Sequence, residues 1–297
     1  MTTGAAKATL LQRLEGLDRI PTLPAVMVPV LRYLQQPLEK LDAQQVSDLI
    51  SRDKSLTAQC LQMASSPLFG RWQKVTSLHD AVLGLGLQRV SDIVMSCCVL
   101  NMMPRGRGFD PVAFWEHSLG CALVSRHFAR KIAYPDPGKA YLAGLLHDLG
   151  LIVNLWVFPK EFSAAFELAH AEGVPLHEAE HSILGFTHCE SGRLLAERWG
   201  LAEDLIEVVA GHHSPKEAHR NAGLVALVEL SDLLCRMSGL NYGYIERREV
   251  DLMAQPGFAV LSEECAGLKE FDWARLTFEM DSYIDDVQAL VRTIYRT

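Results

Sequence analysis

Helix start and stop signals constrain this chain more than any other sequence feature. Apolar residues recur at helical spacing, strand-like alternation is scarce, and proline or glycine falls where helices would begin or end. Asp110 followed by Pro111 pairs a capping side chain with a proline at the first helical position. Thr187 and Glu190 form a T-x-x-E capping box. The pattern predicts an all-α, multi-helix fold.

Three further signals divide the second half of the chain. Asp136 followed by Pro137 predicts another helix start, and Gly150 is placed to end that helix. The sequence "SPKE" at 214–217 predicts one more start, with proline at the first helical position. The double histidine at 212–213 is therefore expected in the joint between two helices.

The best candidate linker is "PRGRGFD" at 104–110, which has one proline and two glycines in seven residues. It predicts an N-terminal helical subdomain over residues 1–104 and a second helical domain over 105–240, which contains the histidines and aspartates discussed below. Residues 241–297 contain a loop-like segment and then an amphipathic helix, and are expected to form a C-terminal helical cap.

Composition excludes several classes of function. The 297 residues are 49% hydrophobic and 22% charged, as in ordinary globular proteins. The net charge of −8 argues against direct binding to nucleic acid or to an anionic membrane. No segment is expected to act as a signal peptide or membrane span. Seven cysteines, an odd number, fall mostly in apolar helical patterns and indicate reduced thiols. We expect a bacterial, cytoplasmic protein.

A group of histidines and aspartates lies on or beside apolar faces. Each alone has a structural explanation, such as a core histidine bonded to a carbonyl or an aspartate paired with a nearby arginine. Together they offer imidazole and carboxylate ligands suited to Zn²⁺, Mn²⁺, Fe or Ni²⁺, in one or two ions. The candidate metal ligands are His117, His147, Asp148, His188, His212, His213 and Asp232.

Other residues are interpreted more simply. Cys189 follows His188 and Cys121 lies one turn after His117, so a mixed His/Cys zinc site is conceivable, but without C-x-x-C buried thiols are the preferred interpretation. The other histidines are expected to be structural or at the surface: His79, His127, His170, His177, His181 and His219. The cations nearest the motif in sequence are Arg193, Lys139 and Lys216.

The ordered set resembles the HD superfamily of metal-dependent phosphohydrolases, whose pattern is H…HD…D on an all-α fold. The spacing from His188 to Gly192 and the double histidine resemble the HD-GYP branch. The N-terminal stretches "IPTLPAVMVPVLRYLQ", "ISRDKSLTAQCLQMASSPLFG" and "SLHDAVLGLGLQRVSDIV" resemble the opening of the HDOD family, the HD-related output domains. "LAGLLHDLG" and "GHHSP" match its second half. This resemblance covers roughly residues 18–235 and implies a bacterial signalling or regulatory module without an assigned activity.

The chain departs from the HD-GYP pattern where phosphate would be handled. Leu151 stands where those enzymes carry lysine, Ala113 stands where some place a third-metal glutamate, and no G-Y-P follows the double histidine. Ser65 replaces the asparagine usual in the HDOD family. Hydrolysis of cyclic-di-GMP is therefore poorly supported.

Three hypotheses follow, in order of preference. The first is a signalling module whose HD-type cleft is structural or senses a small ligand such as a nucleotide, working through protein partners, with oligomerisation left open. The second is a metal-dependent phosphohydrolase acting on a nucleotide or cyclic dinucleotide, in which the ions activate water for attack on phosphorus. The third is an interaction module in which His147 and Asp148 only hold helices together.

Overall fold

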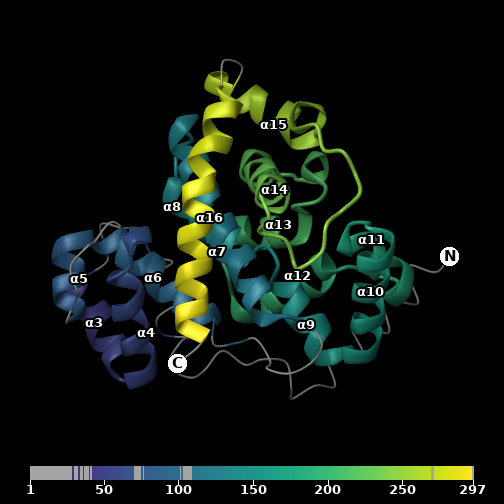
Figure 1. Cartoon of the computed structure of the whole chain (residues 1–297). Helices are drawn as coiled ribbons and strands as arrows, with labels where there is room; N and C mark the ends of the chain where they lie inside the picture. Colours follow the sequence, from purple (N-terminus) through teal and green to yellow (C-terminus); the bar gives the residue numbers. More distant parts are fainter. Residues whose placement is uncertain are drawn as a thin grey trace. The chain divides into compact units, whose positions relative to one another are not determined.

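The computed structural model describes residues 42–69, 77–100, 109–268 and 271–295, and isolated positions 29, 33, 36, 40, 75 and 102. Across these residues the secondary structure is helical, with no strand, which confirms the all-α prediction (Figure 1). The contacts divide the chain into two compact units: one contains residues 104–278, the other 22–103 with 279–297. The predicted three-part division stays a prediction, and the contacts group residues 241–278 with the helices before them.

The N-terminal unit is built from short helices. They are α3 (Ala43–Ser51), α4 (Lys54–Ala64), the 3-10 turn η2 (Pro67–Phe69), α5 (Leu78–Leu85) and α6 (Leu87–Leu100), with residues 279–295 of α16 (Trp273–Tyr295). The Asp53 carboxylate accepts hydrogen bonds from two main-chain N–H groups at the start of α4. Gly86 ends α5 with φ of +84°. Breaks at 52–53 and at Gly86 thus separate α3 from α4 and α5 from α6.

The larger unit holds the remaining helices. They are α7 (Pro111–Lys131), α8 (Pro137–Leu146), α9 (Leu149–Val157), α10 (Pro159–Glu172), α11 (Leu176–Leu184), α12 (His188–Trp199), α13 (Glu203–Gly211), η3 (Pro215–Glu217), α14 (Ala222–Met237), η4 (Leu252–Ala254), α15 (Pro256–Glu264) and η5 (Ala266–Leu268). Helix α7 packs against α8 and α14, and α9 packs against α12. Helices α7, α12 and α14 and the junction between α8 and α9 each supply residues to the site described below.

The start signals are confirmed at three helices. Asp110 caps α7 and Asp136 caps α8, each with a proline directly after it. Thr187 and Glu190 form the predicted capping box of α12. At 214–217 Pro215 takes the first helical position as predicted, but Ser214 makes no side-chain cap and the helix is only a three-residue 3-10 turn.

Gly150 does not end a helix, contrary to the sequence prediction. Helix α8 ends before His147, and Gly150 lies inside α9. A side-chain carbon at 150 would overlap the carbonyl oxygen of His188 and lie 2.8 Å from the nitrogen of Gly192. Both glycines are therefore needed for a close backbone crossing of α9 and α12, which brings His188 next to Asp148.

The segment Pro137–Val157 is the one stretch within the described residues long and apolar enough to span a membrane. Of its most apolar window, 83% is buried inside the protein, and the segment is two helices interrupted at 147–148. Burial of this kind is ordinary for core helices of a globular fold.

Candidate metal centre

The candidate centre is organised around Asp148. Helix α8 ends at Leu146 and α9 begins at Leu149, so His147 and Asp148 occupy the break between them. His147 is fully buried and Asp148 is 2% exposed. A carboxylate at such a position is costly unless charged or hydrogen-bonding partners surround it.

The two carboxylate oxygens of Asp148 face two groups of histidines. Its Oδ2 lies 3.1 Å from Nε2 of His147 and 3.6 Å from Nε2 of His117. Its Oδ1 lies 3.2 Å from Nε2 of His188 and 3.5 Å from Nε2 of His212. Asp148 therefore links the histidines of α7 and the α8–α9 break to those at the start of α12 and the end of α13.

The remaining two predicted residues complete the cluster. Asp232 on α14 has its Oδ1 3.2 Å from Nε2 of His117. His213 has its Nε2 3.2 Å from Nε2 of His188. The fold thus brings all seven candidate residues together, from helices α7, α12 and α14, from the α8–α9 break and from the segment after α13. Their assignment as metal ligands stays a prediction.

Hydrogen bonds to the main chain orient three of the histidine rings. The carbonyl oxygen of Leu240 lies 2.7 Å from Nδ1 of His117, and that of Gly144 lies 2.7 Å from Nδ1 of His147. The carbonyl oxygen of Val208 lies 3.1 Å from Nδ1 of His212. Because a carbonyl only accepts, each Nδ1 carries the hydrogen. In the neutral rings, Nε2 is then a bare lone pair directed into the cluster, as a metal ligand requires.

The spacing of these lone pairs fits a metal ion. Nε2 of His117 lies 3.3 Å from Nε2 of His147, and Nε2 of His188 lies 3.3 Å from Nε2 of His212. Two bare lone pairs at that distance repel each other unless a cation or a shared proton lies between them. Ligands about 2.1 Å from a transition metal ion, at tetrahedral or octahedral angles, are separated by about 3.0–3.4 Å. The donor set and its spacing therefore suit a divalent transition metal.

A buried glutamate that the sequence analysis missed supports His188. Glu180 Oε2 accepts hydrogen bonds from Nδ1 of His188 at 2.6 Å and from its main-chain nitrogen at 2.9 Å, and its Oε1 accepts from Asn154 at 2.9 Å. A carboxylate behind a ligating imidazole fixes the ring and raises its basicity. Glu180 shares the buried face of α11 with Leu176 and Ala179, so a charged residue on an apolar helical stripe was the available signal.

The electrostatics of the cluster favour positive charge. Burial opposes an imidazolium at His147 and His212, but the carboxylate of Asp148 and nearby thiols outweigh it and raise both pKa values to about 10. Burial likewise opposes ionisation of Asp148, yet the adjacent histidines hold the pKa of this carboxyl well below its usual value. Protons and a metal ion thus compete for the same lone pairs, and metal binding releases protons.

Two residues of the loop after α14 and one on α14 close the centre. The hydroxyl of Tyr242 donates a short hydrogen bond to Oδ2 of Asp148. Arg236, four residues after Asp232, lies 2.8 Å from Asp232 Oδ2 and 2.5 Å from Oε1 of Glu246. The spacing of Asp232 and Arg236 was a signal for the arginine, but nothing local marked Tyr242, which the loop carries to the site.

These contacts show where the cations nearest the motif lie, and they revise the expectation for His177. Lys139 and Arg193 pair with Asp204 and Glu197. Neither they nor Lys216 line the small pocket beside Asp148 and His188, which we call the central pocket, whereas Arg236 does. His177 is half-buried beside the centre: its ring stacks on that of His213 with centroids 4.0 Å apart. Burial, with His188 and Arg236 adding to it, lowers the pKa of His177 to about 3.

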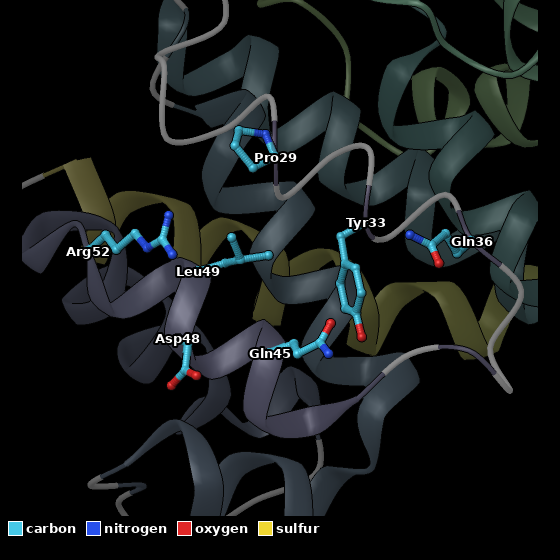
Figure 2. A pocket seen from close by; sticks show the side chains of 7 residues that line it. All are labelled: Pro29, Tyr33, Gln36, Gln45, Asp48, Leu49 and Arg52. Atoms are coloured by element: carbon cyan, nitrogen blue, oxygen red, sulfur yellow. The ribbon is translucent and has the colours of Figure 1, made fainter.

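A second pocket, of about 420 Å³, lies in the N-terminal unit (Figure 2). Proline, tyrosine, glutamine and leucine line it together with two charged residues, Asp48 and Arg52. It has no histidine or cysteine among these residues. A transition metal site is therefore not indicated there.

Comparison with known proteins places the fold. The sequence matches the HDOD domain family over residues 20–215. An uncharacterised protein of Treponema pallidum (strain Nichols) is 25% identical over 228 residues, which are 75% of this chain. The match spans 43% of the length of the Treponema protein.

Solved structures agree with this assignment. An HDOD domain protein of unknown function from Geobacter sulfurreducens is 28% identical, with a TM-score of 0.83 and 98% of each chain covered. A candidate phosphohydrolase from Shewanella amazonensis SB2B has the same fold at 23% identity, with a TM-score of 0.74, 97% of this chain and 98% of the other covered. Because the family match extends over well more than half of its residues, this chain belongs to the HDOD family.

Proposed function

We propose that this chain is a bacterial HDOD-type signal-transduction or regulatory protein with an HD-type metal centre and without robust catalytic activity. One or two divalent transition metal ions, of Fe, Mn, Ni or Zn, would be held by the seven residues around Asp148. The protein would act in the cytoplasm through protein partners or a small nucleotide ligand, without binding nucleic acid directly. Self-association is compatible with this role.

The size of the central pocket carries the proposal. The space beside Asp148 and His188 amounts to about 10 Å³, which is room for about one water molecule. Tyr242 is bonded to Asp148 on one side of it, and Arg236 is neutralised by Asp232 and Glu246 on another. An ion fits in this space but a nucleotide does not, and the larger groove at Cys189 and His213 does not include Asp148 among its lining residues. The space at Asp148 itself therefore favours metal binding over turnover.

A metal-dependent phosphohydrolase, acting on a nucleotide or cyclic dinucleotide, is the second candidate. The position of Asp148 between two histidine groups favours it, since two neighbouring ions can activate water and bind a phosphoryl oxygen. This activity would require Tyr242 to leave Asp148 and Arg236 to exchange a carboxylate for phosphate. Those two displacements are why we rank it second.

The metal content of the freshly purified full chain tests the proposal. We expect close to one or two transition metal ions per chain, lost in Asp148→Ala and His117→Ala, and no robust turnover of a panel of phosphomonoesters, nucleotides and cyclic dinucleotides. Turnover by the wild type that Asp148→Ala abolishes would establish the second candidate. A chain without metal, whose two variants are merely less stable, would instead support a purely structural joint.

A further inference from the structure

A sulfur atom lies within one of the two histidine groups. Cys189 is 8% exposed and follows His188 on the first turn of α12. Its Sγ lies 3.8 Å from Nδ1 of His212. One ligand atom from each of His188, Cys189, His212 and His213 lies within 4.8 Å of all the others, which is close enough for one ion.

The other group has a different donor set. His117, His147 and Asp148 bring their ligand atoms within the same distance of one another, with Asp232 next to His117. These donors are nitrogen and oxygen alone. Thiolate favours softer ions such as Zn²⁺, whereas carboxylate favours harder ions such as Mn²⁺. The two halves of the centre therefore differ in the ion that each prefers.

We propose that His188, Cys189, His212 and His213 form a distinct ion position in which the Cys189 thiolate is a ligand, and that this position selects Zn²⁺ over Mn²⁺. The inference rests on the proposed metal-binding function and deepens it by naming the ion. It changes the role of Cys189 from a buried thiol to a ligand.

The distances between the histidine nitrogens agree with a tetrahedral zinc site. Zn–N distances of about 2.0–2.1 Å place tetrahedral nitrogen ligands about 3.3–3.4 Å apart. In the structure, Nε2 of His188 lies 3.3 Å from Nε2 of His212 and 3.2 Å from Nε2 of His213. With one sulfur, the three nitrogens give the four ligands that zinc prefers in structural sites. The Glu180 carboxylate behind His188 supplies the usual support for such a ligand.

An ion can reach this position from solvent. Cys189 and His213 both line a groove of about 1440 Å³ that follows α12, α13 and η3. The central pocket beside Asp148 offers only about 10 Å³. The sulfur-containing half of the centre is thus the half that faces the groove, where exchange of the ion is least hindered.

Cobalt substitution tests the proposal on the full chain. Co²⁺ is added to metal-free wild type, Cys189→Ser and Cys265→Ser, and bound ions and absorbance are measured together. Cys265 is the matched control, since it is also 8% exposed but lies at the end of α15, outside both ligand groups. We expect a thiolate-to-cobalt charge-transfer band in wild type and in Cys265→Ser. In Cys189→Ser we expect no band, one ion fewer per chain, and Zn²⁺ affinity reduced at least about tenfold with Mn²⁺ binding unchanged.

The outcomes separate this inference from the function on which it rests. Asp148-dependent binding of Co²⁺ without the band, or a band that survives in Cys189→Ser, overturns the thiolate position and leaves the metal-binding function intact. Wild type that binds no ion overturns both. If Cys189→Ser does not fold, wild type still decides: Zn²⁺ should protect Cys189 from alkylation and Mn²⁺ should not, and equal labelling with and without Zn²⁺ rejects the proposal.

Discussion

Two buried cysteines, one in each unit, show how differently the two interiors are built. Cys97 lies on α6 among apolar side chains, and burial together with the neighbouring Cys60 raises the pKa of its thiol well above the usual value. Burial acts in the same direction on Cys189, but His212 and His188 outweigh it and lower the pKa of this thiol to about 6. The same residue type is therefore a neutral core side chain in one unit and a candidate anionic ligand in the other.

This difference shows which kind of interaction stabilises each interior. In the N-terminal unit, the buried part of α4 and α6 consists mainly of apolar side chains such as Met63, Ile93 and Val94, so packing volume dominates. In the larger unit, the interior between α7, α9, α12 and α14 contains ionisable residues that balance one another. Such a polar network stabilises only when every member has a partner.

Substituting Gly150 should have the largest effect, because it breaks the crossing that assembles the polar interior. In Gly150→Ala the new methyl group would overlap the carbonyl of His188. We expect a loss of more than about 3 kcal/mol in free energy of unfolding, or failure to fold. Chemical denaturation checks it. Gly200→Ala is the control: φ is +65° but the space is open, so a cost of only about 1 kcal/mol is expected. Equal costs would show that the crossing tolerates a side chain.

The role of Gly150 also shows how far the sequence could predict this molecule. Periodicity and capping residues predicted helix starts at Asp110, Asp136 and Thr187, because a cap acts through its own next few residues. The function of Gly150 depends on Gly192, 42 residues away in the sequence, so a local pattern suggested a helix end instead. The candidate residues of the centre could likewise be named from the sequence around each one. The residues that they contact in the fold could not.

The site residues that the sequence analysis missed also differ in whether a local pattern marks them. Arg236 and Glu180 lay within reach of sequence patterns, through helical spacing from Asp232 and through a charged position on an apolar face. Tyr242 reaches Asp148 from a loop 94 residues away, and no period or cap encodes that contact. Tertiary contacts from loops are thus the part of the site that the sequence alone left open.

Removing metal should destabilise the larger unit and leave the stability of the N-terminal unit unchanged. If the ion binds only the folded centre, at 100 times its dissociation constant it stabilises that unit by about 2.7 kcal/mol. We expect chelation to speed amide hydrogen exchange in α8, α9, α12 and α14 and to leave α3–α6 unchanged, as measured by mass spectrometry. Met63→Ala is the reciprocal control: it should cost about 2–5 kcal/mol through a cavity while the metal content stays the same. Uniform acceleration on chelation would contradict the distinction between the two interiors.

Glu180→Gln should sharpen the comparison by removing one charge while keeping the shape of the polar interior. The amide can still accept from His188, but the ring loses the carboxylate that raises its basicity. We expect metal affinity to fall about ten- to a hundredfold, with the fold retained. Competition against a chromogenic chelator measures it. Glu178→Gln, an exposed change on the same helix, should leave affinity unaltered; unaltered affinity in Glu180→Gln too would mean that Glu180 only positions helices.

Glu229→Gln should have the smallest effect on stability. It tests the contribution of a single buried carboxylate in the larger unit. Burial raises the pKa of Glu229 to about 7 from an ordinary value of 4.5, although the N–H of Gly257 donates to it. The unfolded chain therefore releases this proton at lower pH than the folded chain does, and stability falls as pH rises from about 4.5 to about 7. Because glutamine does not titrate, the variant should match wild type near pH 4.5 and exceed it by about 1–2 kcal/mol at pH 8.

Urea denaturation at several pH values measures this difference. Glu167→Gln, which removes an exposed carboxylate on α10, controls for the change in net charge. A gain for Glu229→Gln that is equal at pH 4.5 and pH 8 would contradict the assignment, because it would come from packing and not from ionisation. A gain confined to high pH would mean that the polar interior still contains a carboxylate that neither an ion nor a base balances. Substitutions of apolar residues around Cys97, such as Met63, remove no titrating group and should change stability equally at both pH values.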